Sequence, residues 1–348
     1  MPPSEVPETM TAAALDAFGG PDQLRTQSVP VPEVGEGEVL LRVHTAGIGV
    51  WDDAEREGHL VGMMDHEPSF PYVPGSDASG TVAAVGPGVD HVAEGDEVYA
   101  LTWLNPKGGF YAEYGVTEAS HVAPVPDGLS LEEAGALGVS AVTALLGLRD
   151  ALELAEGDSL LVVGAGGGVG HVALQFAKRI GARVLAVASG NDGVALAQEL
   201  GADAVVEGHD GDVAEAVRQF APDGLDAALL FAHPDGLDSV LGAVREGGRV
   251  AWPQGVDPVE SLPEGVEGRP FTYDPDETAR ALADAGRLIE GEGPVPFRVH
   301  VSRSFSRTPS TNGPNEPTSI TSSRTMAARA PRDSTSPCTM AASSSWAW

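Results

Sequence analysis

The chain has 348 residues, enough for two domains with separate cores, because single hydrophobic cores stop growing at about 250 to 300 residues. Its 51 acidic and 20 basic residues give a formal net charge of −31, which repels nucleic acid and anionic membranes, so we expect neither as a partner. The single cysteine, Cys338, excludes an internal disulfide and any zinc site that needs several thiolates.

The composition also bears on location. No apolar run reaches the roughly 18 residues of a membrane span, and the N-terminus lacks the basic-then-apolar order of a signal peptide, so we expect a cytoplasmic protein. Lys107 and Lys178 are the only lysines, and the acidic residues are spread along the chain. This pattern favours the heavily hydrated surface of a halophilic protein. A high-GC genome is an alternative reason for the few lysines, but it does not explain the excess of acid.

The first part of the chain predicts strands. Residues 1–10 are rich in Pro and Glu and are expected to form a disordered leader. Over residues 11–127, short apolar runs alternate with Gly, Pro and Asp, as in GEVLLRVHTAGI and GTVAAVGPGV, which predicts a compact β-rich domain. At Ser130 the pattern becomes helical, and Glu133 completes a capping box.

Residues 128–265 alternate between strand and helix patterns. The runs SLLVVG, RVLAVA, AVV, LDAALLF and GRVAW are short and apolar, as in strands buried on both faces of a parallel sheet, and helical stretches separate them. The sequence therefore predicts a doubly wound α/β domain. Residues 266–305 then predict one more helix and a strand that returns to the first domain. Residues 306–348 lack apolar periodicity and are rich in Ser, Thr, Pro and Arg, which predicts disorder.

The stretch LLVVGAGGGVG places a run of glycines between the predicted strand Ser159–Val163 and a helix that begins near Gly168. The first N–H groups of a helix have no intrahelical acceptor and lie at the positive end of its dipole, so they bind anions. Glycines allow a diphosphate to approach those amides. The run fits an alanine variant of the dinucleotide fingerprint in its strand–turn–helix context. The predicted coenzyme-binding residues here are Ala165, Gly167, Gly168, Val169 and Gly170.

The end of the second strand of this domain distinguishes the two nicotinamide coenzymes. An NAD site usually has Asp or Glu there to bind the ribose hydroxyls, whereas this chain has Ala188 and Ser189. Without that carboxylate a 2′-phosphate is not repelled, and Ser189, Gly190 and Asn191 can donate hydrogen bonds to it. We therefore expect NADP(H) as the coenzyme. No Arg or Lys lies in the turn, so a site that does not discriminate is the alternative.

Several motifs in order resemble the medium-chain dehydrogenase/reductase superfamily, most closely its zinc-free quinone oxidoreductase (zeta-crystallin-like) branch. They are PYVPGSDASGTVAAVG, GFYAEYGV, LGVSAVTALLGL, GAGGGVGHVALQFAKRIGARV and EGGRVAW. The resemblance implies a GroES-like β-rich catalytic domain over 11–127, completed by residues 266–305, beside a Rossmann domain over 128–265. It also implies an active site between the domains and a homodimer formed through the edge of the Rossmann sheet.

The resemblance further implies a reaction without zinc. Zinc-dependent members have Gly-His-Glu where this chain has Gly75-Ser76-Asp77, and a cysteine in the loop that here reads AGIGVWDD, so we expect no metal site. A Lewis acid stabilises the alkoxide in alcohol oxidation, whereas hydride addition to a conjugated acceptor spreads charge onto an oxygen that hydrogen bonds can hold. A quinone or enone is therefore the expected substrate.

Further site residues follow from the same comparison. Thr143 is implied to contact the coenzyme, with an ordinary helix residue as the alternative. Phe231 and Ala232 end a strand at the carboxyl edge of the sheet, where they would touch the nicotinamide or belong to the core. As candidate catalytic residues, Trp51 would wall the substrate pocket and Asp52 would brace its loop; a core anchor and a turn cap are the alternatives. Some members of the branch have a tyrosine two residues after this Asp, where this chain has Ala54. His233 is more simply an exposed loop residue than an acid.

The leading hypothesis is a zinc-independent, NADPH-dependent reductase of a quinone or another conjugated carbonyl compound. A zinc-free oxidoreductase of enoyl thioesters, aldehydes or alcohols is the enzymatic alternative. A redox sensor that binds NADP(H) without catalysis, or an inactive product, is the alternative of another class.

The ending of the chain suggests a change of reading frame. Family members end with a helix, a His-His-Leu motif and a last strand, and residues 320–329 permit a frame that, read one base earlier, spells such a motif. We hypothesise a frameshift near Ser306, with a genuine linker as the alternative. The nucleotide sequence decides between them. If the alternative reading frame does not encode that helix and strand, the frameshift hypothesis is contradicted.

Overall fold

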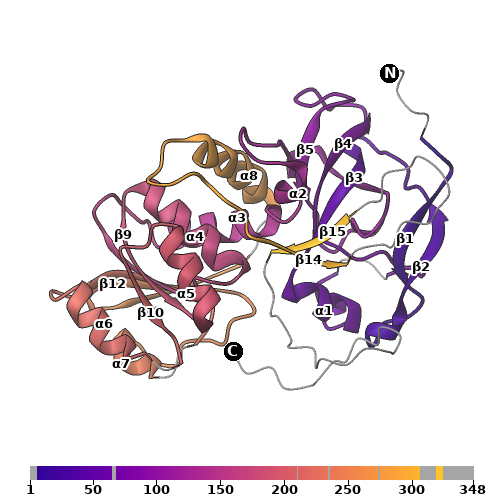
Figure 1. Cartoon of the computed structure of the whole chain (residues 1–348). Helices are drawn as coiled ribbons and strands as arrows, with labels where there is room; N and C mark the ends of the chain where they lie inside the picture. Colours follow the sequence, from indigo (N-terminus) through magenta and orange to yellow (C-terminus); the bar gives the residue numbers. More distant parts are fainter. Residues whose placement is uncertain are drawn as a thin grey trace, which may run out of the picture.

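The computed structural model describes residues 6–64, 68–209, 211–233, 236–272, 275–305 and 319–323. Figure 1 shows two lobes side by side, one rich in strands and one in which helices pack around a sheet. The main sheet of the first lobe has seven strands and that of the second has six. The predicted α/β class with two domains is confirmed.

The β-rich lobe is built mainly from antiparallel strands. Its main sheet has the order β14-β15-β3-β4-β5-β7, and β6 also pairs with β3. These strands are β3 (Glu38–Ile48), β4 (Asp77–Val85), β5 (Glu97–Leu101), β6 (Tyr114–Glu118), β7 (Val122–Pro124), β14 (Val301–Phe305) and β15 (Ser319–Ser323). A separate hairpin consists of β1 (Thr9–Leu15) and β2 (Leu24–Pro30). Helix α1 (Val50–Glu57) follows β3, and 3-10 turns cover Pro21–Gln23, Val61–Met63 and Ala119–His121.

The second lobe contains a parallel sheet with the order β10-β9-β8-β11-β12-β13. Its strands are β8 (Ser159–Val163), β9 (Arg183–Ala188), β10 (Ala204–Glu207), β11 (Leu225–Leu230), β12 (Val244–Pro253) and β13 (Glu267–Phe271). The helices are α2 (Leu131–Ala134), α3 (Gly138–Leu145), a π-helical turn (Leu146–Ala151), α4 (Gly168–Ile180), α5 (Gly190–Glu199), α6 (Val213–Phe220), α7 (Leu237–Leu241) and α8 (Pro275–Glu290).

Burial on both faces explains the uninterrupted apolar strands of this sheet. In β8, Leu160 and Val162 belong to one hydrophobic core, and Leu161 and Val163 belong to another on the opposite face. Successive side chains of a strand point to opposite faces, so a strand covered by helices on both sides needs apolar residues at every position.

Three predicted boundaries differ from the structure. β1 begins at Thr9, so the leader is shorter than residues 1–10, and residues 1–5 lie outside the described residues. β13 pairs in parallel with β12, so the second lobe continues past the predicted boundary at residue 265. Disorder was predicted for residues 306–348, but residues 319–323 form β15, which pairs in parallel with β3. The rest of that segment lies outside the described residues.

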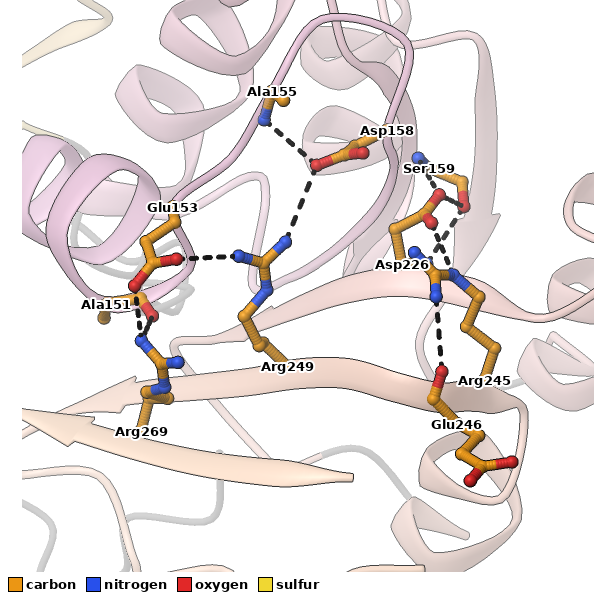
Figure 2. Close-up of polar contacts among 10 residues, drawn as sticks. All are labelled: Ala151, Glu153, Ala155, Asp158, Ser159, Asp226, Arg245, Glu246, Arg249 and Arg269. Atoms are coloured by element: carbon orange, nitrogen blue, oxygen red, sulfur yellow. Dashed lines mark hydrogen bonds and ion pairs between the residues drawn. The ribbon is translucent and has the colours of Figure 1, made fainter. Parts of the chain in front are cut away.

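Arginines join the amino-terminal ends of the parallel strands, at the edge opposite the turn that follows β8 (Figure 2). Glu153 lies between two of them, 2.9 Å from Arg269 and 3.3 Å from Arg249. Arg249 also lies 3.9 Å from Asp158. These ion pairs connect β12 and β13 to the loop that leads into β8.

A second group in Figure 2 is centred on Asp226 at the start of β11. Its carboxylate accepts hydrogen bonds from the main-chain N–H of Ser159, at 2.7 Å, and from the Ser159 hydroxyl, at 2.6 Å. Arg245 donates to its other oxygen at 2.6 Å. The neighbouring strands β8, β11 and β12 are thus tied together where they begin.

Helix α8 connects the lobes. It packs against α3 of the second lobe and against β7 of the first. The hydroxyl of Tyr99, in β5, donates a 2.6 Å hydrogen bond to the carbonyl of Leu282 in α8. After α8, the chain returns to the first lobe as β14, in agreement with the predicted returning strand. Across the described ranges, no helix combines the length and apolarity needed to cross a membrane.

Candidate functional site

The turn between β8 and α4 is shaped by positions that have no room for a side chain. Gly164 has a φ of 82°, in the left-handed region that favours glycine. A Cβ on Gly170 would overlap the carbonyl oxygen of Gly164. A Cβ on Gly166 would lie 2.9 Å from the Cα of Gly193 in α5. Glycine at these positions lets α4 begin directly against the end of β8.

The start of α4 fits a diphosphate. Gly167 is the N-cap and makes no side-chain capping bond, and the next three N–H groups, of residues 168–170, have no intrahelical acceptor. Together with the positive end of the helix dipole they attract an anion. The structure thus brings four of the five predicted loop residues to the start of α4. Ala165 is fully buried in the core, and its main-chain N–H donates to the carbonyl of Val187 at 2.9 Å, so this N–H is not free for a ligand.

The fingerprint did not include Gly164 and Gly166, although both contribute to the turn. The run of glycines was the available signal, but a spacing rule selects only some of its members. Their roles depend on a left-handed φ and on the approach of α5, which the sequence does not specify locally.

The end of β11 lies next to this turn. The main-chain N–H of Phe231 donates to the carbonyl of Val163 at 3.1 Å. A Cβ on Gly164 would lie 3.3 Å from the Cβ of Phe231 and 3.8 Å from that of Ala232. The structure therefore places these two predicted residues against the turn. His233 is half-buried, not exposed as expected, and its Nε2 is buried with no hydrogen-bond partner among the described residues.

Thr143 differs from the rest of its helix. The other seven residues of α3 are buried, whereas Thr143 is half-buried. α3 packs against α4, the helix that begins at the glycine turn. This placement is compatible with a coenzyme contact and with an ordinary helix residue alike.

A carboxylate that the sequence analysis missed reaches the end of β9. Ser189, Gly190 and Asn191 are exposed at the start of α5, as expected. Glu207, at the end of the neighbouring strand β10, accepts a 2.9 Å hydrogen bond from the N–H of Gly190. A carboxylate group thus lies beside the end of β9, although it belongs to the neighbouring strand β10.

The loop before α1 is held by its own side chains. Oδ2 of Asp52 accepts a 2.5 Å hydrogen bond from the N–H of Gly49, so Asp52 braces the start of α1. Trp51 packs against the hydrophobic core that includes α3 and α4, although α1 belongs to the other lobe. Its indole Nε1 is buried without a hydrogen-bond partner in the described part of the chain. A Cβ on Gly49 would overlap the Trp51 ring, which explains the glycine.

Asp52 belongs to an acidic cluster of five buried side chains. Its members are Asp52, Glu55, Tyr72, Asp77 and Tyr111. Glu55 accepts a 2.6 Å hydrogen bond from the hydroxyl of Tyr72, and Asp77 accepts a 2.5 Å hydrogen bond from the N–H of Val139. The carboxyl group of Asp52 and the hydroxyl of Tyr111 are buried and interact with each other.

Burial favours the neutral form of each acid in this cluster. It raises the pKa of Asp52 well above its usual range, and the charge of Glu55 adds to the effect. It also raises the pKa of Glu55, and that of Asp77 to about 7. For Tyr111, burial and then the charge of Asp52 raise the pKa. We infer that the cluster holds at least one proton at neutral pH, because coupled buried carboxyls do not all ionise together.

The positions that correspond to zinc ligands in the family carry other residues here. Asp77 is hydrogen-bonded to the main chain of α3, Ser76 is buried, and the loop AGIGVWDD contains no cysteine. Zinc sites in proteins usually use Cys, His and carboxylate groups in tetrahedral sets. Within the described ranges, no group of three or more His, Cys, Asp or Glu side chains could hold a metal ion.

The molecule has two lobes, and one of them combines a parallel sheet with a helix whose N-terminus can bind an anion. This is the architecture of oxidoreductases that bind dinucleotides. Family models agree with both lobes: "Alcohol dehydrogenase GroES-like domain" matches residues 35–127 and "Zinc-binding dehydrogenase" matches residues 168–260. The quinone oxidoreductase of Rattus norvegicus is 32% identical over 243 residues, which cover 69% of this chain and 72% of that protein. An alcohol dehydrogenase of Geobacillus stearothermophilus is 31% identical over 265 residues, or 69% and 76%.

Solved structures give the same result. The crystal structure of an NAD-dependent alcohol dehydrogenase has a TM-score of 0.70 and 32% identity, over 81% of this chain and 89% of that chain. A mycobacterial quinone oxidoreductase has a TM-score of 0.67 and 28% identity, over 80% and 87%. The chain belongs to the medium-chain dehydrogenase/reductase superfamily, in its quinone oxidoreductase branch, and is an oxidoreductase. The dehydrogenases of this superfamily bind nicotinamide coenzymes.

Gly170→Ala should weaken coenzyme binding at least about tenfold and lower the free energy of unfolding by about 1 to 3 kcal/mol, because the new Cβ pushes α4 away from Gly164. Gly193→Ala is the matched control: its Cβ meets its nearest neighbour at 3.6 Å, an ordinary contact, and alanine favours a helix. Coenzyme titration and urea unfolding measure both. Equal behaviour of the two variants would contradict the close-packing argument.

Asp77→Asn should make the protein more stable than the wild type at pH 8, by on the order of 2 kcal/mol. The folded Asp77 keeps its proton up to a pKa of about 7, whereas the unfolded residue releases it near its ordinary value of 3.8. Wild-type stability therefore falls as the pH rises between these values, and the variant lacks this loss. Urea unfolding of both proteins at pH 5 and pH 8 measures the difference, which should be smaller at pH 5.

Proposed function

We propose that the protein reduces a quinone or another conjugated carbonyl compound with NADPH, without a metal ion. The observation that carries the proposal is the donor set at the family's zinc positions, where Asp77 is bonded to Val139 and neither His nor Cys is present. The similarity to curated quinone oxidoreductases supports the same substrate class.

The chemistry follows from what these side chains can stabilise. Oxidation of an alcohol creates an alkoxide, which zinc-dependent members stabilise with a Lewis acid. Reduction of a conjugated carbonyl compound places the developing charge on an oxygen that hydrogen-bond donors can hold. We propose as this donor the Nε1–H of Trp51, in the first turn of α1, which has no hydrogen-bond partner among the described residues.

The proposed roles of the residues follow from their places. The N–H groups of Gly168, Val169 and Gly170 hold the diphosphate, and Thr143 contacts the coenzyme from α3. Phe231 and Ala232 contact the nicotinamide end at the carboxyl edge of β11. When bound, the coenzyme supplies the hydride. Trp51 walls the acceptor side and excludes water, and Asp52 holds the Trp51 loop through its bond to Gly49.

The proposal of NADPH rests on the end of β9, where the strand's own residues, Ala188 and Ser189, supply no carboxylate for the ribose hydroxyls. Ser189 and Asn191 are exposed there and can donate to a 2′-phosphate. Glu207 opposes that phosphate through its negative charge, although its carboxylate is already bonded to Gly190. The balance between these groups sets the preference for NADPH over NADH.

The function is tested by steady-state oxidation of NADPH with a panel of quinones and enones, with and without a chelator. We expect turnover that the chelator does not reduce. Alcohol oxidation that depends on added zinc, or tight NADPH binding with no turnover of any acceptor, would contradict the proposal. The second result would favour a redox sensor.

Glu207→Gln should raise the preference for NADPH over NADH by about three- to tenfold, because it removes a charge next to the expected 2′-phosphate and keeps an acceptor for Gly190. The ratio of kcat/KM for the two coenzymes measures the preference. Asp223→Asn, at an exposed position between α6 and β11, is the control for removal of one acidic charge. An unchanged ratio in the Glu207 variant would place the phosphate elsewhere.

A further inference from the structure

One face of α4 carries three polar side chains at intervals of four residues: His171, Gln175 and Arg179. We name them the polar row. Four residues of an α-helix rise about 6 Å, and two residues of extended chain span about 6.6 Å. A polar row with this spacing therefore matches alternate residues of an extended segment. The segment that faces it is residues 295–300, which joins α8 to β14.

Gln175 makes the central contact of this row. Its Nε2 donates to the carbonyl of Arg298 at 2.9 Å, and its Oε1 accepts from the N–H of Arg298 at 2.9 Å. The side-chain amide of Gln175 thus forms hydrogen bonds with both the N–H and the carbonyl of Arg298, as the main chain of a neighbouring strand would. Gln175 is fully buried, and its Nε2 also donates to the carbonyl of His171 at 3.0 Å. Loss of the bond from Arg298 would therefore leave the buried Oε1 without a partner among the described residues.

The two ends of the polar row contact the same segment. Arg179 donates to the carbonyl of Val295 at 3.3 Å, and its guanidinium lies 5.2 Å from the centre of the Phe297 ring. His171 accepts a 3.3 Å hydrogen bond at Nε2 from the N–H of His300. The contacts therefore run antiparallel along the helix, from residue 295 near its end to residue 300 near its start.

His171 also reaches the coenzyme turn. Its Nδ1 donates a 2.9 Å hydrogen bond to the carbonyl of Gly167, the N-cap of α4. A neutral imidazole with the proton on Nδ1 satisfies both contacts, because one ring nitrogen donates and the other accepts. Burial lowers the pKa of His171 to about 4, which keeps this neutral form at physiological pH. One buried side chain thus joins the glycine turn to the segment that enters β14.

We propose that His171 and Gln175 are positioning residues that couple coenzyme binding at the Gly167 turn to the seating of residues 298–300, and through them to β14 in the other lobe. Residues 298–300 directly precede β14, which belongs to the seven-stranded sheet. A ligand that fixes the turn also fixes Gly167 and His171, and so stabilises the next hydrogen bond. By reciprocity, a well-seated segment favours coenzyme binding. The inference rests on the proposed use of NADPH.

Amide hydrogen exchange of Arg298 and His300, with and without saturating NADPH, tests the coupling. In the wild type NADPH should slow both exchange rates at least about threefold. Gln175→Leu and His171→Leu should speed exchange in the free protein about tenfold, weaken NADPH binding about three- to tenfold, and abolish the effect of NADPH on these amides. Gln198→Leu, at an exposed position of α5, is the matched control and should behave like the wild type.

Two conservative variants distinguish the two hydrogen bonds of His171, one to Gly167 and one from His300. His171→Gln can keep an acceptor near His300, and His171→Asn can keep a donor near Gly167. Only His171→Gln should restore slow exchange of the His300 amide in the free protein, and neither should restore the response to NADPH.

The coupling is overturned if the leucine variants, folded by circular dichroism, bind NADPH as the wild type does, or if NADPH leaves both amides unchanged in the wild type. The assay needs no turnover. A wild type that binds NADPH but reduces no acceptor contradicts the proposed function alone, and one that binds no NADPH contradicts both.

Discussion

The contact between the start of α4 and the end of β8 is the constraint on which the site depends. Gly170 lies so close to the carbonyl of Gly164 that a methyl group does not fit between them. This closeness directs the free N–H groups of α4 toward the carboxyl edge of the sheet, beside the end of β11. The two hydrophobic cores on either face of β8 hold the strand in place, so the turn is supported by the most buried part of the second lobe.

The β-rich lobe contains a cluster of buried acids where it faces α3. Three carboxyl groups are buried together, and the groups that partner them are phenols and main-chain N–H groups. These donors favour the ionised form of each carboxyl group, but burial outweighs them and raises the pKa of all three acids. A zinc-dependent relative has metal-ligating side chains at the corresponding positions. In this chain one of these positions holds Asp77, whose pKa is raised by burial to about 7.

Local sequence patterns predicted the parts of the structure that depend on local geometry. The buried strands, the capping box at Ser130 and the glycine turn each follow from residues within one element or one turn. The contribution of β13 was missed because its sequence, EGRPF, contains Gly and Pro and no apolar alternation; its place follows from pairing with β12. Glu207 was missed for a similar reason, since only the adjacency of β9 and β10 brings it to Gly190.

The acidic cluster could not be found from spacing at all. Asp52 and Glu55 come from α1, Asp77 from β4, and the two tyrosines from connecting segments, so no motif joins them. The loop residues Trp51 and Asp52 were identified through family resemblance. Their contacts with the neighbouring lobe and with Gly49 required the fold.

The N–H groups at the start of α4 have one further consequence. Main-chain amides do not titrate, so an anion-binding turn made from them keeps its attraction at any pH at which the fold survives. The buried acids whose pKa is raised lie in the other lobe, around α1 and β4. The main-chain groups that bind the anion therefore do not share the pH dependence of these acids.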